Sequence, residues 1–214
     1  MKTLLEYINE TIRHLPRNVS GVIVFDIDDT LLKVDSSKIA IYKKEPGKTE
    51  IALTTEEFAN DPDASDPNKK DWFDLRDFSD PIKVYNSIIS GTPLLKNLKI
   101  MDAYINAGYD FCFLTARSCE ETIKQALDEF LMVNRHGNKL EKIGNAFKKT
   151  ISCAVNDEYK QYPGKTDADK KANILKQLCQ DYDKVVFVDD DHKNVRAAIN
   201  LKIDNLKVIK AWDE

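Results

Sequence analysis

Polar side chains directly follow three apolar runs of this 214-residue chain. The runs and the polar residues after them are 22–25 with Asp26 and Asp28, 111–114 with Thr115 and Arg117, and 185–188 with Asp189 and Asp190. Carboxylates that crowd together repel one another and resist burial unless a proton or a cation neutralises them. Several hard oxygen ligands that leave positions open suit Mg²⁺, which keeps some of its waters and takes phosphate oxygens. If these runs meet in the fold, the residue types predict a magnesium site that handles phosphoryl groups.

Each acidic group also has a purely structural interpretation. Asp after a strand commonly caps a helix or a turn, so the run 189–191 alone is typical of a solvated turn. A calcium-binding loop that begins at Asp26 requires Gly at its sixth position, where Leu31 stands. The three strand ends taken together favour a site, because ordinary turns do not specify this combination of residue types.

Along the chain, continuous apolar runs typical of buried strands alternate with segments that have the apolar periodicity of an amphipathic helix. Buried strands are expected at 22–25, which should be covered on both faces, at 111–114 and at 185–188, and further strands at 151–155 and 206–209. Amphipathic helices are expected at 3–15, 93–106 and 118–131, after the capping box that opens at Thr166, and around 197–201. This order predicts an α/β fold: a doubly wound, mostly parallel, Rossmann-like sheet with helices on both faces. Ligand sites in such sheets lie at the carboxyl ends of the strands, where the polar residues above stand.

Residues 33–90 do not fit this alternation and are interpreted as an insertion after the first strand. The segments 38–42 and 50–53 flank Pro46-Gly47 and predict a hairpin, and Thr54 or Thr55 is expected to cap a short helix at 56–59. The polar stretch 60–68 contains two prolines and is expected to be a mobile loop. We find no core periodicity in the insertion.

Composition excludes several classes of protein. Lys and Arg number 32 against 36 Asp and Glu, a net charge of −4, so there is no overall electrostatic reason to wrap nucleic acid. No run approaches the roughly 18–20 apolar residues of a membrane-spanning helix, and Glu6 and Glu10 interrupt the apolar start that a signal peptide needs. The 4 cysteines form no Cys-x-x-Cys pair and are expected to be reduced thiols. We therefore expect a cytoplasmic protein with no membrane partner.

At the three strand ends the chain resembles the haloacid dehalogenase-like (HAD) hydrolase superfamily, in its phosphatase branch. The run 22–25 with Asp26, Asp28 and Thr30 matches the first motif, a hydrophobic strand followed by Asp-x-Asp-x-Thr. Residues 113–117 are similar to the second motif, a strand ending in Thr or Ser, and residues 185–190 to the fourth, a strand ending in an acidic pair. The superfamily places its cap after the first motif. The resemblance therefore implies a core domain formed by 1–32 and 91–214 and a small cap or flap at 33–90.

The resemblance and general chemistry together imply roles for the first two carboxylates. Asp26 would be the nucleophile that takes the phosphoryl group as an aspartyl-phosphate, and its carboxylate would also bind Mg²⁺. Asp28 would protonate the leaving oxygen, then deprotonate the attacking water, and give its backbone carbonyl to the metal. Family members that lack this second Asp include dehalogenases and phosphonatases, so Asp28 favours phosphate-ester chemistry.

The remaining motif residues are assigned to the metal and the substrate. Asp190 is expected to be the direct Mg²⁺ ligand, with Asp189 behind it or sharing the role. Thr115 would hold a phosphoryl oxygen through its hydroxyl, and Thr30 would orient the nucleophile. Arg117 either contacts the substrate or pairs with an acid.

The third motif of the superfamily is a lone Lys, for which Lys165, Lys170 and Lys171 are candidates. Lys171 shares one helix face with the apolar residues Leu175 and Leu178, whereas Lys170 is rotated by about 100° from that face. Lys171 is therefore expected to reach the strand ends, bind the phosphoryl group and stabilise its charge in the transition state.

The sequence thus favours a Mg²⁺-dependent phosphohydrolase that cleaves a phosphomonoester. A partial similarity to the phosphatase domains of viral polynucleotide-repair enzymes favours a nucleotide or a nucleic-acid end over other small-molecule phosphomonoesters. The alternative is a non-catalytic phosphoryl-ligand binding protein or scaffold on the same fold. The sequence does not determine the oligomeric state.

Overall fold

The computed structural model describes residues 20–134, 147–152 and 164–211. The helix expected at 3–15 lies outside these residues, as does the end of the strand expected at 151–155. Among the described residues, no helix is both long enough and apolar enough to cross a membrane.

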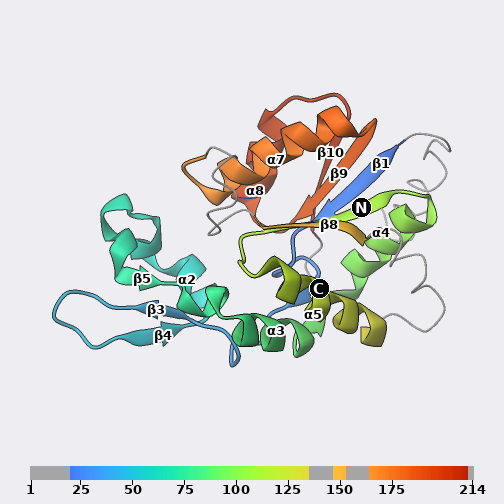
Figure 1. Cartoon of the computed structure of the whole chain (residues 1–214). Coiled ribbons are helices and arrows are strands. Elements are labelled where there is room, and N and C mark those ends of the chain that lie inside the picture. Colours follow the sequence, from blue (N-terminus) through green and yellow to red (C-terminus); the bar gives the residue numbers. More distant parts are fainter. Residues whose placement is uncertain (1–19, 135–146, 153–163, 212–214) are drawn as a thin grey trace.

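A five-stranded sheet forms the centre of the molecule, in the order β10-β9-β1-β7-β8 (Figure 1). Its strands are β1 (Gly21–Phe25), β7 (Asp110–Thr115), β8 (Phe147–Ser152), β9 (Lys184–Asp189) and β10 (Leu206–Lys210). Every neighbouring pair is parallel. The predicted parallel α/β sheet is confirmed, with β8 beginning four residues before the expected start at 151.

Helices cover both faces of this sheet. Figure 1 shows α7 (Asp167–Asp181) and α8 (His192–Asn200) on one face, and α3 (Pro81–Ile89), α4 (Leu95–Asn106) and α5 (Glu120–Asn134) on the other. Successive strand residues alternate between the two layers. Ile23 of β1 is buried in the core cluster on the α4 and α5 side, whereas Val22 belongs to the cluster that contains Leu175 of α7. The doubly wound arrangement is therefore confirmed.

Local signals at the helix ends agree with the sequence in most places. Thr166 caps α7 through a complete capping box with Asp169. Gly108, after α4, adopts a φ of 92°, a backbone conformation that glycine reaches without strain. The helix expected from residue 118 begins at Glu120.

The chain leaves and re-enters the core through a short antiparallel pair, β2 (Leu32–Lys33) with β6 (Thr92–Pro93). Between them, β3 (Ile41–Lys43), β4 (Ile51–Leu53) and β5 (Phe73–Asp74) form an antiparallel sheet in the order β4-β3-β5. The predicted hairpin is β3 with β4, and Thr54 caps α2 (Thr55–Asn60) as expected. Figure 1 shows this part extending away from the parallel sheet.

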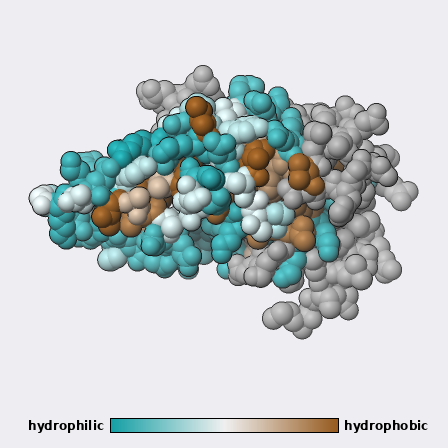
Figure 2. Space-filling view, turned by 90° about the horizontal axis from the view of Figure 1, so that it is seen from below, coloured by the Kyte–Doolittle hydropathy of each residue, from teal (hydrophilic) through white to brown (hydrophobic). Residues whose placement is uncertain are grey.

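The face seen in Figure 2 is mostly hydrophilic, with hydrophobic side chains in small separate groups.

The expectation of an irregular loop at 60–68 is wrong, and its mobility is untested. The segment forms two 3-10 helices, η1 (Pro62–Ser65) and η2 (Pro67–Trp72), whose first turns are capped by the side chains of Asp61 and Asp66. Lys43 of β3 places its ammonium 2.7 Å from Asp61 and 2.8 Å from Asp63. Ion pairs with a neighbouring strand thus order a segment that has no apolar pattern of its own.

The insertion also contributes to the main core, contrary to the absence of core periodicity inferred from its sequence. Val84 and Ile88 of α3 are fully buried in the cluster beneath the parallel sheet. Asp80 caps this helix and Pro81 occupies its first turn. Two buried apolar positions in a nine-residue helix, beside the buried but polar Ser87, are too few to show a helical period in the sequence.

Candidate functional site

Three carboxylates meet at the carboxyl end of β1 and β9. Asp26, Asp189 and Asp190 each place one ligand atom within 4.8 Å of the others. The pairing of β1 with β9 causes this, because Phe25 lies beside Val188 and the Asp26 amide donates to the Val188 carbonyl at 3.0 Å. Asp26 and Asp189 are buried and Asp190 is partly exposed. The structure thus brings these residues together as expected, while their individual roles remain predictions.

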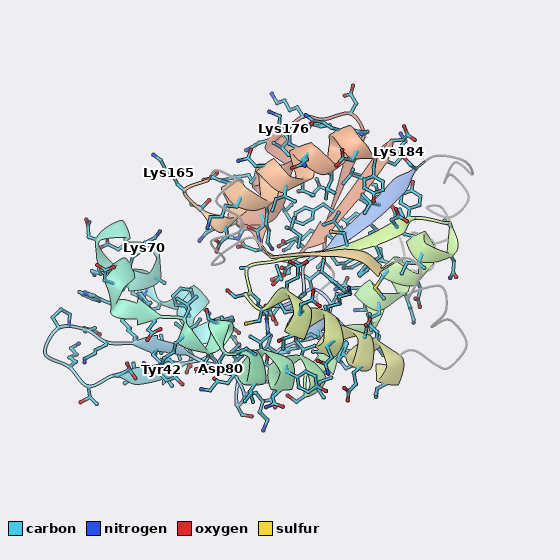
Figure 3. All side chains as sticks on the ribbon, in the orientation of Figure 1. Tyr42, Lys70, Asp80, Lys165, Lys176 and Lys184 are labelled. Carbon is cyan, nitrogen blue, oxygen red and sulfur yellow. The ribbon has the colours of Figure 1, made fainter. Side chains whose placement is uncertain are left out.

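Lys171 is the lysine that reaches this cluster. Its ammonium lies 2.8 Å from Asp26 Oδ1 and 2.8 Å from Asp189 Oδ2, and the side chain is 3% exposed. Lys170 instead approaches Asp167 on its own helix, and Lys165 is exposed and extends away from the sheet (Figure 3). Of the three candidates, helix periodicity therefore selected the residue that lies at the strand ends.

The cluster carries more negative charge than Lys171 neutralises. Burial raises the pKa of Asp26 well above its usual value; Lys171 opposes this effect, and the carboxylates of Asp189, Asp28 and Asp190 add to it. Burial and the neighbouring Asp189 raise the pKa of Asp190 to about 6, against a hydrogen bond from Thr30. Two carboxylates whose ionisation is this unfavourable, those of Asp26 and Asp190, fit a hard divalent cation, which would stabilise both in the charged form. The group of Asp26, Asp189 and Asp190 could therefore bind a metal ion.

Neutral polar side chains fix the orientation of the acidic pair. The Thr30 hydroxyl donates to Asp190 Oδ1 and accepts from the Asp190 amide, both at 3.0 Å. The side-chain amide of Asn194 donates to both oxygens of Asp189 at 3.1 Å. Asn97, on α4, donates to the Thr30 carbonyl at 2.9 Å and is fully buried. Asn97 was not among the residues predicted from the sequence, although its position as a polar residue within the apolar stripe of that helix was the available signal.

Asp28 lies outside the group of three. Its carboxylate pairs with Arg117, whose Nε is 2.8 Å from Oδ2 and whose Nη2 is 2.5 Å from Oδ1. Arg117 is fully buried, so of the two interpretations left open for it, pairing with an acid is what the structure shows. A contact between Arg117 and substrate remains a prediction.

Thr115 ends β7, the other neighbour of β1 in the sheet. It is fully buried, and its hydroxyl accepts a hydrogen bond from the Arg117 amide at 3.2 Å. The position beside β1 agrees with the expected strand end, and the contact with a phosphoryl oxygen remains a prediction.

Comparisons with known proteins add little to this geometry. No protein-family model matches the sequence, and no curated protein matches it significantly. Among solved structures, the chain is similar to one described as "Structure of Pnkp1/Rnl/Hen1 complex", with a TM-score of 0.44 and 13% identity over 93% of this chain and 49% of that chain. The chain therefore spans about half the length of that protein. A TM-score this low supports no conclusion about function, so the resemblance to the HAD superfamily rests on the motif residues and their placement.

Proposed function

We propose that this protein is a Mg²⁺-dependent phosphohydrolase that cleaves a phosphomonoester through an aspartyl-phosphate on Asp26. The observation that carries the proposal is the position of Asp26 at the end of β1, in contact with Lys171 and grouped with Asp189 and Asp190. An anionic phosphoryl group can approach a carboxylate only where cations offset the repulsion, and this site offers one ammonium and a set of ligands for a divalent ion.

Each site residue has a separate role in the proposed reaction. Asp26 attacks phosphorus, and Lys171 stabilises charge on the equatorial oxygens of the transferred group. Asp28 gives a proton to the leaving oxygen and afterwards takes one from the attacking water. Thr115 holds a phosphoryl oxygen. A magnesium ion held by Asp26, Asp190 and Asp189, together with the Asp28 carbonyl, would neutralise the phosphate charge and orient it toward Asp26.

The competing proposal is a phosphoryl-ligand binding protein or scaffold without turnover. Grouping three carboxylates, two of them buried, destabilises a fold, because the charges must be at least partly desolvated beside one another. A scaffold gains nothing from this arrangement. A nucleophile and a metal site require it.

Asp26→Asn tests the nucleophile directly. The variant should lose Mg²⁺-dependent hydrolysis of an aryl phosphate while unfolding at a similar or higher temperature, since one charge leaves a repulsive cluster. Asp29→Asn is the matched control: Asp29 is exposed in the same loop with a φ of 54°, which Asn also tolerates, so turnover should persist. Retained turnover in Asp26→Asn would show that the nucleophile is misassigned. Saturable binding of a phosphomonoester by the wild type with no hydrolysis would favour the scaffold.

Within this class we propose a nucleotide or a nucleic-acid end phosphate as substrate, on the motif similarity described above. A panel of sugar phosphates, nucleotides and oligonucleotides with 3′ or 5′ phosphates, assayed with Mg²⁺, tests it. The highest kcat/KM for a sugar phosphate would contradict this choice without affecting the assignment of the nucleophile.

A further inference from the structure

Arg117 connects Asp28 to the helix that ends the insertion. The guanidinium holds both oxygens of Asp28 through Nε and Nη2, and its Nη1 donates to Ser87 Oγ of α3 at 2.7 Å. Ser87 is fully buried, and its own hydroxyl proton goes to the Val84 carbonyl at 2.8 Å. The Ser87 oxygen is therefore oriented to accept from Arg117.

The backbone around Arg117 is bound to the same part of the insertion. The amide of Ser118 donates to the Phe78 carbonyl at 3.3 Å, and the Cys119 thiol lies 3.4 Å from the Ser79 carbonyl. The Phe78 ring centroid is 5.8 Å from the centre of the guanidinium. These contacts hold the loop after β7 against residues 78–87. The orientation of the Arg117 guanidinium therefore depends on how α3 packs.

A fully buried guanidinium requires partners in fixed directions, because its five donors lie in one plane. Here those directions match the carboxylate of Asp28 on one side and α3 on the other. The Asp28 side chain is 25% exposed while that of Arg117 is 1% exposed. Arg117 thus binds the Asp28 carboxylate on its buried side, and the other side of this carboxylate is open to solvent.

We propose that Arg117, supported by Ser87, is a positioning residue that sets the orientation of the Asp28 carboxylate for proton transfer. This inference rests on the proposed function and differs from a contact between Arg117 and substrate. In the first step a carboxylate oxygen of Asp26 forms a bond to phosphorus, the bond from phosphorus to the leaving oxygen breaks, and Asp28 gives that oxygen a proton. In the second, water attacks phosphorus, the bond to Asp26 breaks and Asp28 takes the water proton. An aryl leaving group departs without the proton, so with an aryl phosphate only the second step requires a well-placed Asp28.

The test compares rapid-mixing and steady-state kinetics of the full chain with Mg²⁺ and two substrates, an aryl and an alkyl phosphate. Arg117→Ala should keep a rapid burst of aryl alcohol close to one per enzyme, while steady-state turnover falls by about 100-fold, the effect of a misplaced catalytic group. For the alkyl phosphate, kcat/KM should fall by a similar factor. Arg117→Lys should recover part of the loss, and Ser87→Ala should show the same pattern with a loss of about 3- to 10-fold. Arg76→Lys, in an exposed ion pair with Glu50, is the control and should match the wild type.

Other outcomes would overturn the inference. A loss of kcat/KM on the aryl phosphate as large as that on the alkyl phosphate, with a raised KM, would mean that Arg117 binds the phosphate. A second contrary result is a burst amplitude that falls in proportion to turnover in all three variants, Arg117→Ala, Arg117→Lys and Ser87→Ala. That result would mean that Arg117 only maintains the fold. Wild-type protein that forms neither product nor phosphoenzyme would refute the proposed function and this inference with it.

Discussion

Removing the charge of Asp190 should stabilise the metal-free protein. Burial, with the neighbouring Asp189, raises the pKa of Asp190 from 3.8 to about 6. A carboxyl group whose pKa is higher in the folded state binds its proton more tightly there than in the unfolded chain. Its ionisation therefore destabilises the fold progressively as the pH rises from about 4 to about 6, and the full effect is present above that range.

The size of the effect follows from the same values. The difference between 3.8 and about 6 is about 2 pKa units, and each unit corresponds to about 1.4 kcal/mol. Ionised Asp190 therefore lowers the free energy of unfolding by up to about 3 kcal/mol at neutral pH. In a chain of this length that is a change in melting temperature of roughly 6–12 °C. Asn at this position keeps an oxygen that can accept from the Thr30 hydroxyl, so the substitution removes mainly the charge.

Urea unfolding, followed by circular dichroism between about pH 5 and about pH 8, measures this effect. With a chelator present, Asp190→Asn should be more stable than the wild type by the full amount at the alkaline end and by only about half of it at the acid end. Added Mg²⁺ should stabilise the wild type more than the variant, because the variant has lost a ligand charge. Asp204→Asn, which removes an exposed carboxylate, is the control and should follow the wild type. An Asp190→Asn variant no more stable than the wild type near pH 8 in chelator would refute the reasoning.

Two lysine substitutions test other parts of the structure. Lys171→Gln removes the cation shared by Asp26 and Asp189, so turnover should fall by about 100-fold or more and the melting temperature should drop. Lys170→Gln, one position earlier on α7, should change neither, and equal effects from both would contradict the assignment. Lys43→Met removes the partner of Asp61 and Asp63, so limited proteolysis within the segment 61–72 should accelerate, whereas Lys48→Met in the same hairpin should leave the rate unchanged. An unchanged cleavage rate in Lys43→Met would mean that the ion pairs do not order this segment.

The core strands were predictable because their signals are local. The runs in β1, β7 and β9 are apolar at successive positions, as strands covered on both faces require, and Thr166 begins α7 with a complete capping box. The two 3-10 helices at 62–72 had local signals in Asp61-Pro62 and Asp66-Pro67, but their ion pairs with Lys43 of a neighbouring strand were not predictable from the local sequence. The helix α3 was missed because its two buried apolar residues reveal their role only when packed beneath the sheet.

The sequence by itself determined which polar residues end each strand and which lysine shares the apolar face of its helix, because both depend on spacings of a few residues. Tertiary structure alone decided that Asp26 and Asp28 have different partners. Asp26 meets Lys171, which is 145 positions away, and Asp28 meets Arg117, which is 89 positions away. These contacts depend on the order of β9, β1 and β7 in the sheet and on the packing of α3. Neither the strand order nor the helix packing can be read from the spacing of residues along the chain.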